Sequence, residues 1–415
     1  MPVNTQPSVE QRPSEVRGDR PTGSALEVLR VFGKLGITCF GGPIAHLGYF
    51  RDEFVVRRRW LDESSYVDLV ALCQFLPGPA SSQVGFSIGL MRAGYRGGLA
   101  AWTGFTLPSA FLLVLFAYAA STLDGHAGAG LLHGLKLVAV AIVAQAVFGM
   151  ARTLCPDRER ASIAVVAALI ILFSATSIVQ IAAIVFGGLA GLVLCRNASP
   201  AAGGHLAIHV SRGVGLASLT AFFVLLVILP LGRGLLHSPN LDLFDAFYRS
   251  GALVFGGGHV VLPLLREAFV TPGWVSDDAF LAGYGAAQAV PGPLFTFAAY
   301  LGAVADRSQP LVGAALGLIG IFLPGLLILL GTLPLWDAFR RRIGAQAAMR
   351  GVNAAVVGLL GAALYNPVWT TSVKTPPDFA IALVGFVLLQ VWRAPPLLVV
   401  MVSAIAGTVV SLISS

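Results

Sequence analysis

The chain has 415 residues, of which 56% are hydrophobic and only 11% are charged, and its mean hydropathy is +0.81. A soluble domain carries about a quarter charged residues, so this composition argues against a water-soluble enzyme. The net charge of +7 comes from basic residues in short clusters between apolar runs. These clusters form no continuous stripe, which argues against nucleic-acid binding and favours loops that orient the chain in a membrane.

Residues 1–23 are polar and rich in Pro and Arg, which predicts a disordered cytoplasmic tail. Uncharged runs that can cross a hydrocarbon core of about 30 Å follow. The run 161–195 would be about 52 Å long as one helix, so we expect two short spans that turn near residues 174–177. The predicted spans lie at 97–123, 135–151, 161–195 (two spans), 213–232, 308–336, 351–373, 379–392 and 394–415.

Four further apolar stretches are interrupted by Gly and Pro. Residues 35–50 contain Phe40-Gly41-Gly42-Pro43, and residues 250–265 contain Phe255-Gly256-Gly257-Gly258. Residues 69–91 contain Gln74 followed by Pro77-Gly78-Pro79, and residues 279–305 contain Gln288 followed by Pro291-Gly292-Pro293. Proline removes a donor N–H and clashes with the preceding turn, so these stretches are predicted to be broken helices buried in protein or lining a cavity.

The four broken stretches are two copies of one unit. Arg51-Asp52 matches Arg266-Glu267, Trp60 matches Trp274, Glu63 matches Asp277, and further on Gly134 matches Gly351. The chain is therefore predicted to be all-α and polytopic, with homologous halves at 24–200 and 240–415. A linker at 201–239 carries an extra transmembrane helix.

The distribution of arginine predicts how each half is oriented. Basic residues collect at 51–59 and 92–96 in the first half, whereas the loop 121–127 has none. In the second half the loop that matches 121–127 carries several arginines, at 340–350. Because cytoplasmic loops are enriched in Lys and Arg, the halves are predicted to be inverted, with the N-terminus inside and the C-terminus outside. An inverted repeat with broken helices is typical of secondary transporters.

Helices that begin inside the membrane present free N–H groups and a positive dipole end. Such ends suit a small oxyanion, whereas carbonyls at the opposite ends would suit a cation, and both alternatives stay open at this point. The residues expected to form these ends are Gly41, Gly42, Pro77, Gly78, Pro79, Ser81, Ser82, Gly256, Gly257, Gly258, Pro291, Gly292, Pro293 and Thr296.

Matched polar residues lie near the breaks. Lys34 and Arg249 precede the Phe-Gly-Gly breaks, and Arg51 and Arg266 follow them, so these four basic residues are candidates for holding a dianion. The alternative is that they extend to the membrane surface, with Arg51 and Arg266 paired to the neighbouring Asp52 and Glu267. Gln74 and Gln288 either donate to the oxyanion or cap carbonyls at the kink.

The chain carries no nucleotide-binding motif and no catalytic serine, cysteine or zinc constellation. The four cysteines have no metal-ligand spacing and are expected to be reduced and buried. We therefore expect no enzymatic activity, no cofactor and no metal site, and transport driven by a gradient or by a partner.

The paired Phe-Gly-Gly and Gln-x-x-Pro-Gly-Pro motifs, and the fused two-half length, resemble the chromate transporters of the chromate ion transporter superfamily. The resemblance covers nearly all of the chain from about residue 24. It implies a multi-pass bacterial inner-membrane protein that exports chromate and gives chromate resistance, with sulfate as a related oxyanion. The second copy departs from the first, because Gly-Gly-Gly-His stands where the first copy has Gly-Gly-Pro-Ile.

Two other functions remain as alternatives. One is a sulfate transporter or exchanger that uses the same cavity, because the two tetrahedral dianions cannot be separated from sequence. The other is a channel-like or lipid-moving membrane protein, which the almost wholly apolar long spans argue against. The expected partners are the oxyanion, membrane lipid and, as an open alternative, a second copy of the chain in a homodimer.

Overall fold

The computed structural model describes residues 23–120, 125–173, 176–196, 208, 210–236, 238–255, 257–336 and 342–413. Within these ranges the chain is built of helices and short links, without a strand. Six of the described helices are long and apolar enough to cross a membrane. The predicted all-α polytopic fold is confirmed, whereas almost all of the predicted tail at 1–23 lies outside the described residues.

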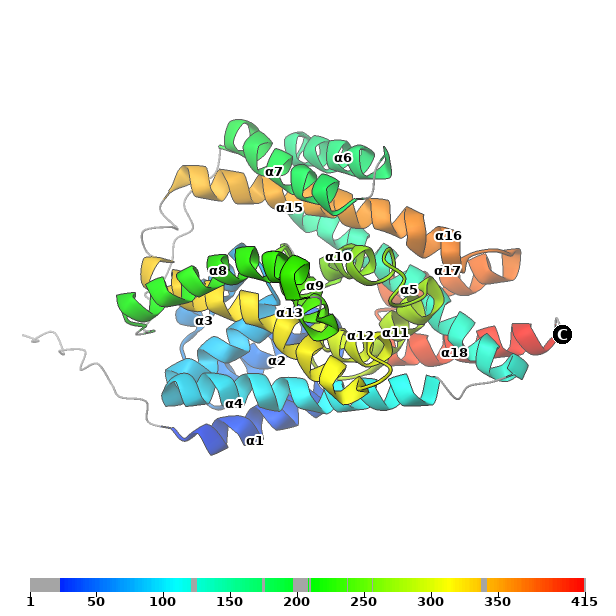
Figure 1. Cartoon of the computed structure of the whole chain (residues 1–415), viewed down its shortest axis with the longest axis horizontal. Coiled ribbons are helices and arrows are strands. Elements are labelled where there is room, and N and C mark those ends of the chain that lie inside the picture. Colours follow the sequence, from blue (N-terminus) through cyan, green and yellow to red (C-terminus); the bar gives the residue numbers. More distant parts are fainter. Residues whose placement is uncertain are drawn as a thin grey trace, which may run out of the picture.

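The elements of the second half follow the order of the first (Figure 1). The first half contains α1 (Ala25–Thr38), α2 (Gly42–Phe50), the π-helical η1 (Arg51–Arg57), α3 (Glu63–Phe75), α4 (Ala80–Ala120), α5 (Gly125–Leu154), α6 (Arg158–Phe173) and α7 (Ser177–Leu194). The extra helix α8 (Arg212–Leu236) follows. The second half contains α9 (Pro239–Ala252), η2 (Gly258–Val260), α10 (Val261–Phe269), α11 (Asp277–Ala289), η3 (Leu294–Thr296), α12 (Phe297–Ala305), α13 (Pro310–Thr332), η4 (Leu333–Leu335), α15 (Ile343–Ala363), η5 (Leu364–Trp369), α16 (Thr370–Ser372), α17 (Pro376–Gln390) and α18 (Pro396–Ile413).

The predicted interruptions occur where Gly and Pro break the helical pattern. α1 ends before the first Phe-Gly-Gly motif and α2 begins within it, while α3 and α4 flank the first Pro-Gly-Pro. The long apolar run 161–195 is divided between α6 and α7, so its predicted turn is confirmed. Each of these ends follows from local chemistry, because proline and a glycine of positive φ cannot continue a helix.

α4 is two helices folded against each other at Ala93 and Gly94, where the Gly94 φ is +64°. A Cβ added to Gly89 would lie 2.3 Å from the carbonyl oxygen of Gly97. In a straight helix these two residues would be about 12 Å apart along the axis. The segment 80–92 therefore returns along 95–120, as α12 returns along α13 in the second half, where residues 306–309 form the turn.

Contacts at the end of segment 80–92 show that the broken helices of the first half are hairpins. Arg92 pairs with Glu27 in the first turn of α1 at 3.2 Å, and its guanidinium lies 4.9 Å from the ring of Trp60, just before α3. The starts of α1 and α3 and the end of segment 80–92 therefore lie together at one end of the molecule. The breaks lie inside, and each broken pair returns to the end of the molecule from which it starts.

The same arrangement holds in the second half. Arg266 near the end of α10 binds Asp277 at the start of α11, and the Tyr300 hydroxyl of α12 donates to the carbonyl of Ala279 at 2.9 Å. The outer ends of these hairpins therefore meet as well. In Figure 1, the 95–120 part of α4 and its counterpart α13 run in opposite directions, as do α5 and α15.

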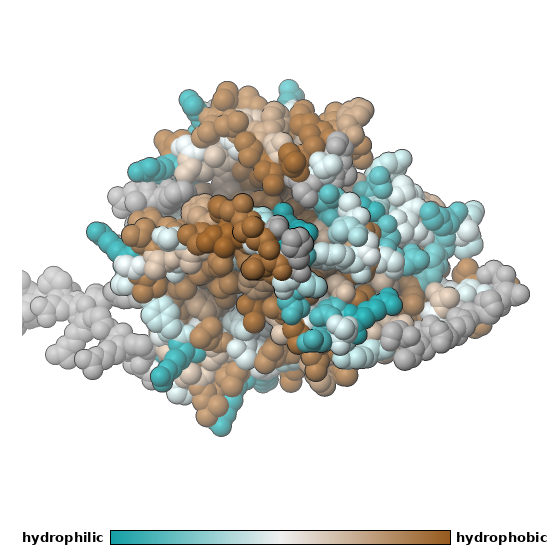
Figure 2. All heavy atoms as spheres, viewed as in Figure 1, coloured by the Kyte–Doolittle hydropathy of each residue, from teal (hydrophilic) through white to brown (hydrophobic). Residues whose placement is uncertain are grey.

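The halves exchange their last helical pairs. α6 and α7 pack on α15, and α17 and α18 pack on α5. A Cβ on Gly351 would lie 1.9 Å from the Gly187 carbonyl oxygen, and one on Gly407 would lie 2.6 Å from that of Gly130. Small residues let helices approach closely in lipid, where no hydrophobic force drives them together. Figure 2 shows hydrophobic side chains gathered over α6, α7 and α8, the surface expected of a membrane protein.

Candidate functional site

Two reciprocal hydrogen bonds join the breaks of the two halves. The Gly78 N–H donates to the carbonyl of Val254 at 2.7 Å, and the Gly292 N–H donates to the carbonyl of Cys39 at 2.8 Å. Val254 follows α9 and Cys39 follows α1, so each Pro-Gly-Pro is bonded to the Phe-Gly-Gly link of the opposite half. The four breaks therefore form one junction between the halves.

The two Phe-Gly-Gly links also face each other in this junction. A Cβ added to Gly42 would lie 4.0 Å from Nε2 of His259, and one added to Gly258 would lie 3.1 Å from Cγ of Pro43. φ is +100° at Gly41, +79° at Gly42 and +154° at Gly257, conformations that glycine adopts without steric cost. Gly256 lies outside the described residues.

The glycines of the Pro-Gly-Pro links have a positive φ and a close neighbour in both halves. φ is +117° at Gly78 and +95° at Gly292. A Cβ on Gly78 would lie 2.9 Å from Cα of Gly325, and one on Gly292 would lie 2.6 Å from Oγ of Ser109. The four flanking prolines Pro77, Pro79, Pro291 and Pro293 are buried.

Three helical segments begin at the junction without a side-chain cap, as α9, α13 and α15 do elsewhere in the chain. α2, η2 and η3 start without a side-chain cap, whereas α1, α3 and α11 are capped by Ser24, Asp62 and Ser276. Uncapped starts leave N–H groups free for a ligand. The carbonyls of Cys39 and Val254, which follow the incoming helices, are already bonded across the junction, whereas the uncapped starts offer N–H donors of the kind that bind anions. Among the described residues, the buried Gln83 Oε1 is an acceptor without a partner.

Serine and threonine side chains next to the Pro-Gly-Pro links behave differently. Ser81 and Ser82 are both 3% exposed, and among the described residues the Ser82 hydroxyl has no hydrogen-bond partner. The Thr296 hydroxyl donates to the Pro293 carbonyl at 2.7 Å. Ser82 is therefore available to a ligand, whereas Thr296 is engaged locally.

The matched glutamines are not equivalent in the structure. Gln74 is exposed, and Gln288 is half-buried with an Nε2 that has no partner among the described residues. Sequence reasoning missed Gln83, which is fully buried and whose Nε2 donates to the carbonyls of Pro77 at 3.0 Å and Gly325 at 2.8 Å. A glutamine four residues after Pro79 in an uncharged run was the signal that could have identified it.

Arg51 and Arg266 lie at the outer ends of the hairpins. Arg51 pairs with Glu63 at 2.7 Å, and Arg266 binds Asp277 through two hydrogen bonds of 2.8 and 3.0 Å. Their main partners are thus acids at the start of the next helix, because the hairpin brings those ends together, and not the chain neighbours. Arg51 follows Gly42 by about 13 Å of helix, so the structure does not bring it to the junction.

The other two basic candidates, Lys34 and Arg249, have different surroundings. Lys34 lies on an exposed face of α1, whereas Arg249 binds Asp245 at 2.8 Å. Asp245 is fully buried and also lies 3.6 Å from Arg233. Arg249 is therefore partly neutralised, while Lys34 keeps an exposed ammonium.

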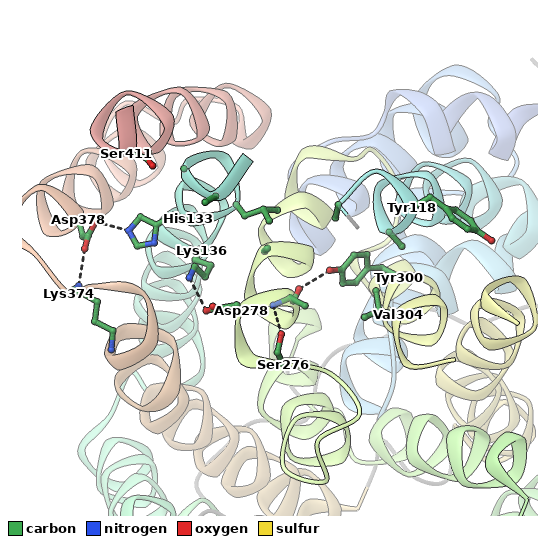
Figure 3. A pocket seen from close by; sticks show the side chains of 18 of the residues that line it. Tyr118, His133, Lys136, Ser276, Asp278, Tyr300, Val304, Lys374, Asp378 and Ser411 are labelled. Atoms are coloured by element: carbon green, nitrogen blue, oxygen red, sulfur yellow. Dashed lines mark hydrogen bonds and ion pairs between the residues drawn. The ribbon is translucent and has the colours of Figure 1, made fainter. Parts of the chain in front are cut away.

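A cavity of about 1020 Å³, here called the vestibule, opens at the end of the molecule where α4 and α18 end (Figure 3). In it Lys136 binds Asp278 at 2.8 Å and the His133 Nε2 lies 2.7 Å from Asp378, so both contacts join α5 of the first half to the second half. None of the site residues predicted from sequence lines the vestibule. Among the described residues, no cluster of three or more His, Cys, Asp or Glu could hold a metal ion.

Matched sets of broken helices that meet between two halves define this protein as a multi-pass α-helical membrane transporter. The family model described as "Chromate transporter" matches residues 26–192 and 241–408, once in each half. The chain therefore belongs to the chromate transporter family.

This chain is similar to two chromate transport proteins over most of its length. It is 29% identical to the "Chromate transport protein" of Pseudomonas aeruginosa over 94% of this chain and 93% of that protein. It is 27% identical to the "Probable chromate transport protein" of Synechococcus elongatus over 94% of this chain and 96% of that protein. The "Uncharacterized transporter YwrB" of Bacillus subtilis is 32% identical over 37% of this chain and 81% of its own length. No solved structure matches the chain.

Proposed function

We propose that this protein exports chromate from the cytoplasm across the bacterial inner membrane and so gives chromate resistance. The observation that carries the proposal is the junction, where reciprocal hydrogen bonds hold four breaks together and uncapped helix starts leave donors for a dianion. The family match supports chromate as the substrate.

The proposed anion site lies at the junction. The uncapped starts of α2, η2 and η3 contribute backbone N–H groups, and the Ser82 hydroxyl and the Gln288 amide contribute donors without other partners. A dianion accepts several charge-assisted hydrogen bonds, each shorter and stronger than a neutral one. Lys34 and Arg249 add positive charge on the helices that lead to the breaks.

We propose that the halves are inverted in the membrane and alternate the access of this site. Opposite directions of matched helices in Figure 1 support this orientation, and so does the placement of Arg92 beside the start of α1 at the N-terminal end. The hairpins of the first half open to that end and those of the second half open to the other. Rocking of one set against the other would then expose the junction to each side in turn.

The experiment that tests this function is uptake of radiolabelled chromate into inverted membrane vesicles, which measures export in the cell. We expect gradient-dependent chromate uptake that exceeds the uptake of vesicles without the protein. Sulfate is the competitor. Sulfate uptake without chromate uptake would show that the substrate is sulfate and not chromate. Absence of both activities under every gradient would contradict the proposal.

The inverted orientation predicts that positions 124 and 341 lie on opposite faces of the membrane. Single cysteines at these positions, in a variant whose four native cysteines are replaced by alanine, are expected to react with a membrane-impermeant reagent from opposite sides. Labelling of both positions from the same side would contradict the inversion.

Lys34→Gln and Arg249→Gln test the two basic residues on the incoming helices. Removal of a cation that contacts a dianion is expected to weaken the apparent chromate affinity by about ten- to a hundredfold. Arg249→Gln is also expected to lower stability, because buried Asp245 loses its partner at 2.8 Å. Affinities are measured in vesicles and normalised to inserted protein, and unchanged affinity in both variants would remove these residues from the site.

A further inference from the structure

We propose that Lys136 in the vestibule is a second binding site for the transported oxyanion and that Asp278 competes with the anion for it. This inference rests on the proposed function and extends it to a residue that lies in the vestibule, apart from the junction. The chemical class of the ligand is a tetrahedral dianion such as chromate or sulfate.

Lys136 is a basic residue inside a candidate membrane span, where a charged side chain needs a partner or water. It lies in the span that begins at Gly128, and its side chain is only 13% exposed. An ionisable side chain at membrane depth faces a partner or a watery cavity, because lipid does not solvate its charge. Lys136 has both, since its Nζ lies 2.8 Å from Asp278 Oδ1 and it lines the vestibule.

Asp278 is a weak partner that an anion can replace. Its side chain is 71% exposed, and ion pairs with one member in water contribute little stability. The other carboxylate in the lining, Asp378, is already engaged, because its oxygens accept bonds from His133 and from the backbone N–H groups of Lys374 and Thr375. Asp278 is therefore the carboxylate that responds to an arriving anion.

The vestibule has room for a hydrated anion. Its volume of about 1020 Å³ corresponds to roughly thirty water molecules at about 30 Å³ each. Arg307 and Lys374 also line it, and the Lys374 ammonium donates to the carbonyl of Thr370. Figure 3 shows Lys136 and Asp278 reaching toward each other from α5 and α11. Small residues such as Ala117, Gly130 and Ala282 provide the space.

The Lys136–Asp278 ion pair has no charged counterpart at the matched positions of the other half. By the match of Gly134 with Gly351 and of Glu63 with Asp277, the counterparts of Lys136 and Asp278 are the uncharged Asn353 and Ser64. In the proposed orientation the vestibule faces outward, on the side where an exporter releases its substrate. Lys136 would receive the anion from the junction, and the return of Asp278 to Lys136 would displace it.

The test is equilibrium binding of radiolabelled chromate to the purified full-length protein, with sulfate as the competitor. Lys136→Gln removes a charged donor and is expected to weaken binding about tenfold or more. Asp278→Asn removes the competitor and is expected to tighten binding by about three- to tenfold. Arg57→Gln removes one positive charge from a side chain that is 70% exposed and lies outside the vestibule, while Glu53 keeps its pair with Arg58, so this control is expected to stay within about twofold.

Opposite shifts distinguish a binding site from a structural ion pair. If Asp278→Asn weakens binding as Lys136→Gln does, or if neither changes it, the inference is wrong, while chromate uptake by the parent protein leaves the proposed function standing. A parent protein that neither binds nor transports chromate or sulfate overturns both. If Lys136→Gln does not fold, Lys136→Arg, which keeps the charge, and Asp278→Asn decide: the inference requires binding to be retained in the first and tightened in the second.

Discussion

Replacement of Gly78 or Gly292 by alanine is expected to reduce chromate transport at least about tenfold, because both glycines hold the junction. Their φ values of +117° and +95° cost an alanine roughly 1–3 kcal/mol. The added Cβ would meet Gly325 Cα at 2.9 Å and Ser109 Oγ at 2.6 Å. Any shift that relieves these contacts stretches the bonds to Val254 and Cys39 that join the halves.

The measurement is the initial rate of chromate uptake into inverted vesicles, normalised to inserted protein. Gly48→Ala is the matched control, because Gly48 lies in the last turn of α2 and an added Cβ there meets open space. We expect that variant to transport at the parental rate. Parental rates in both Gly78→Ala and Gly292→Ala would show that transport does not depend on the geometry of the junction.

Gly351→Leu is expected to destabilise the folded protein by about 3 kcal/mol or more, because it forces apart α7 and α15. A Cβ on Gly351 would lie 1.9 Å from the Gly187 carbonyl oxygen and 2.7 Å from the Gly191 Cα. Both are backbone atoms, which cannot turn away as a flexible side chain does, so the helices must separate and lose their contact.

Thermal unfolding of the detergent-purified protein and the yield of monodisperse material measure this effect. Gly361→Leu is the control, since Gly361 lies on the same helix with open space around it. Equal stability of the two variants would mean that the contact of α7 with α15 does not hold the halves together.

Much of the local structure is determined by the sequence alone. Proline and glycine end helices through their own backbone chemistry, so the four breaks and the division of the run 161–195 could be predicted. The repeat was readable because matched motifs recur in the same order. The all-α membrane class follows from composition, since spans in lipid must satisfy their backbone hydrogen bonds internally.

The sequence did not determine which distant groups meet. Arg51 pairs with Glu63 rather than mainly with Asp52, which lies 3.9 Å away, because the hairpin brings together the end of one helix and the start of the next. Likewise, the fold at Ala93 and Gly94 turns the helical run 80–120 back on itself.

Only the tertiary structure decided that the breaks of the two halves are bonded to each other and that the last helical pairs are exchanged. It also created the vestibule, where His133 and Lys136 meet Asp378 and Asp278, residues that lie 245 and 142 positions away in the chain. No local pattern encodes such contacts, because they depend on how closely small residues let whole helices approach. The motifs thus specified where the helices break, and packing specified what those breaks and charges face.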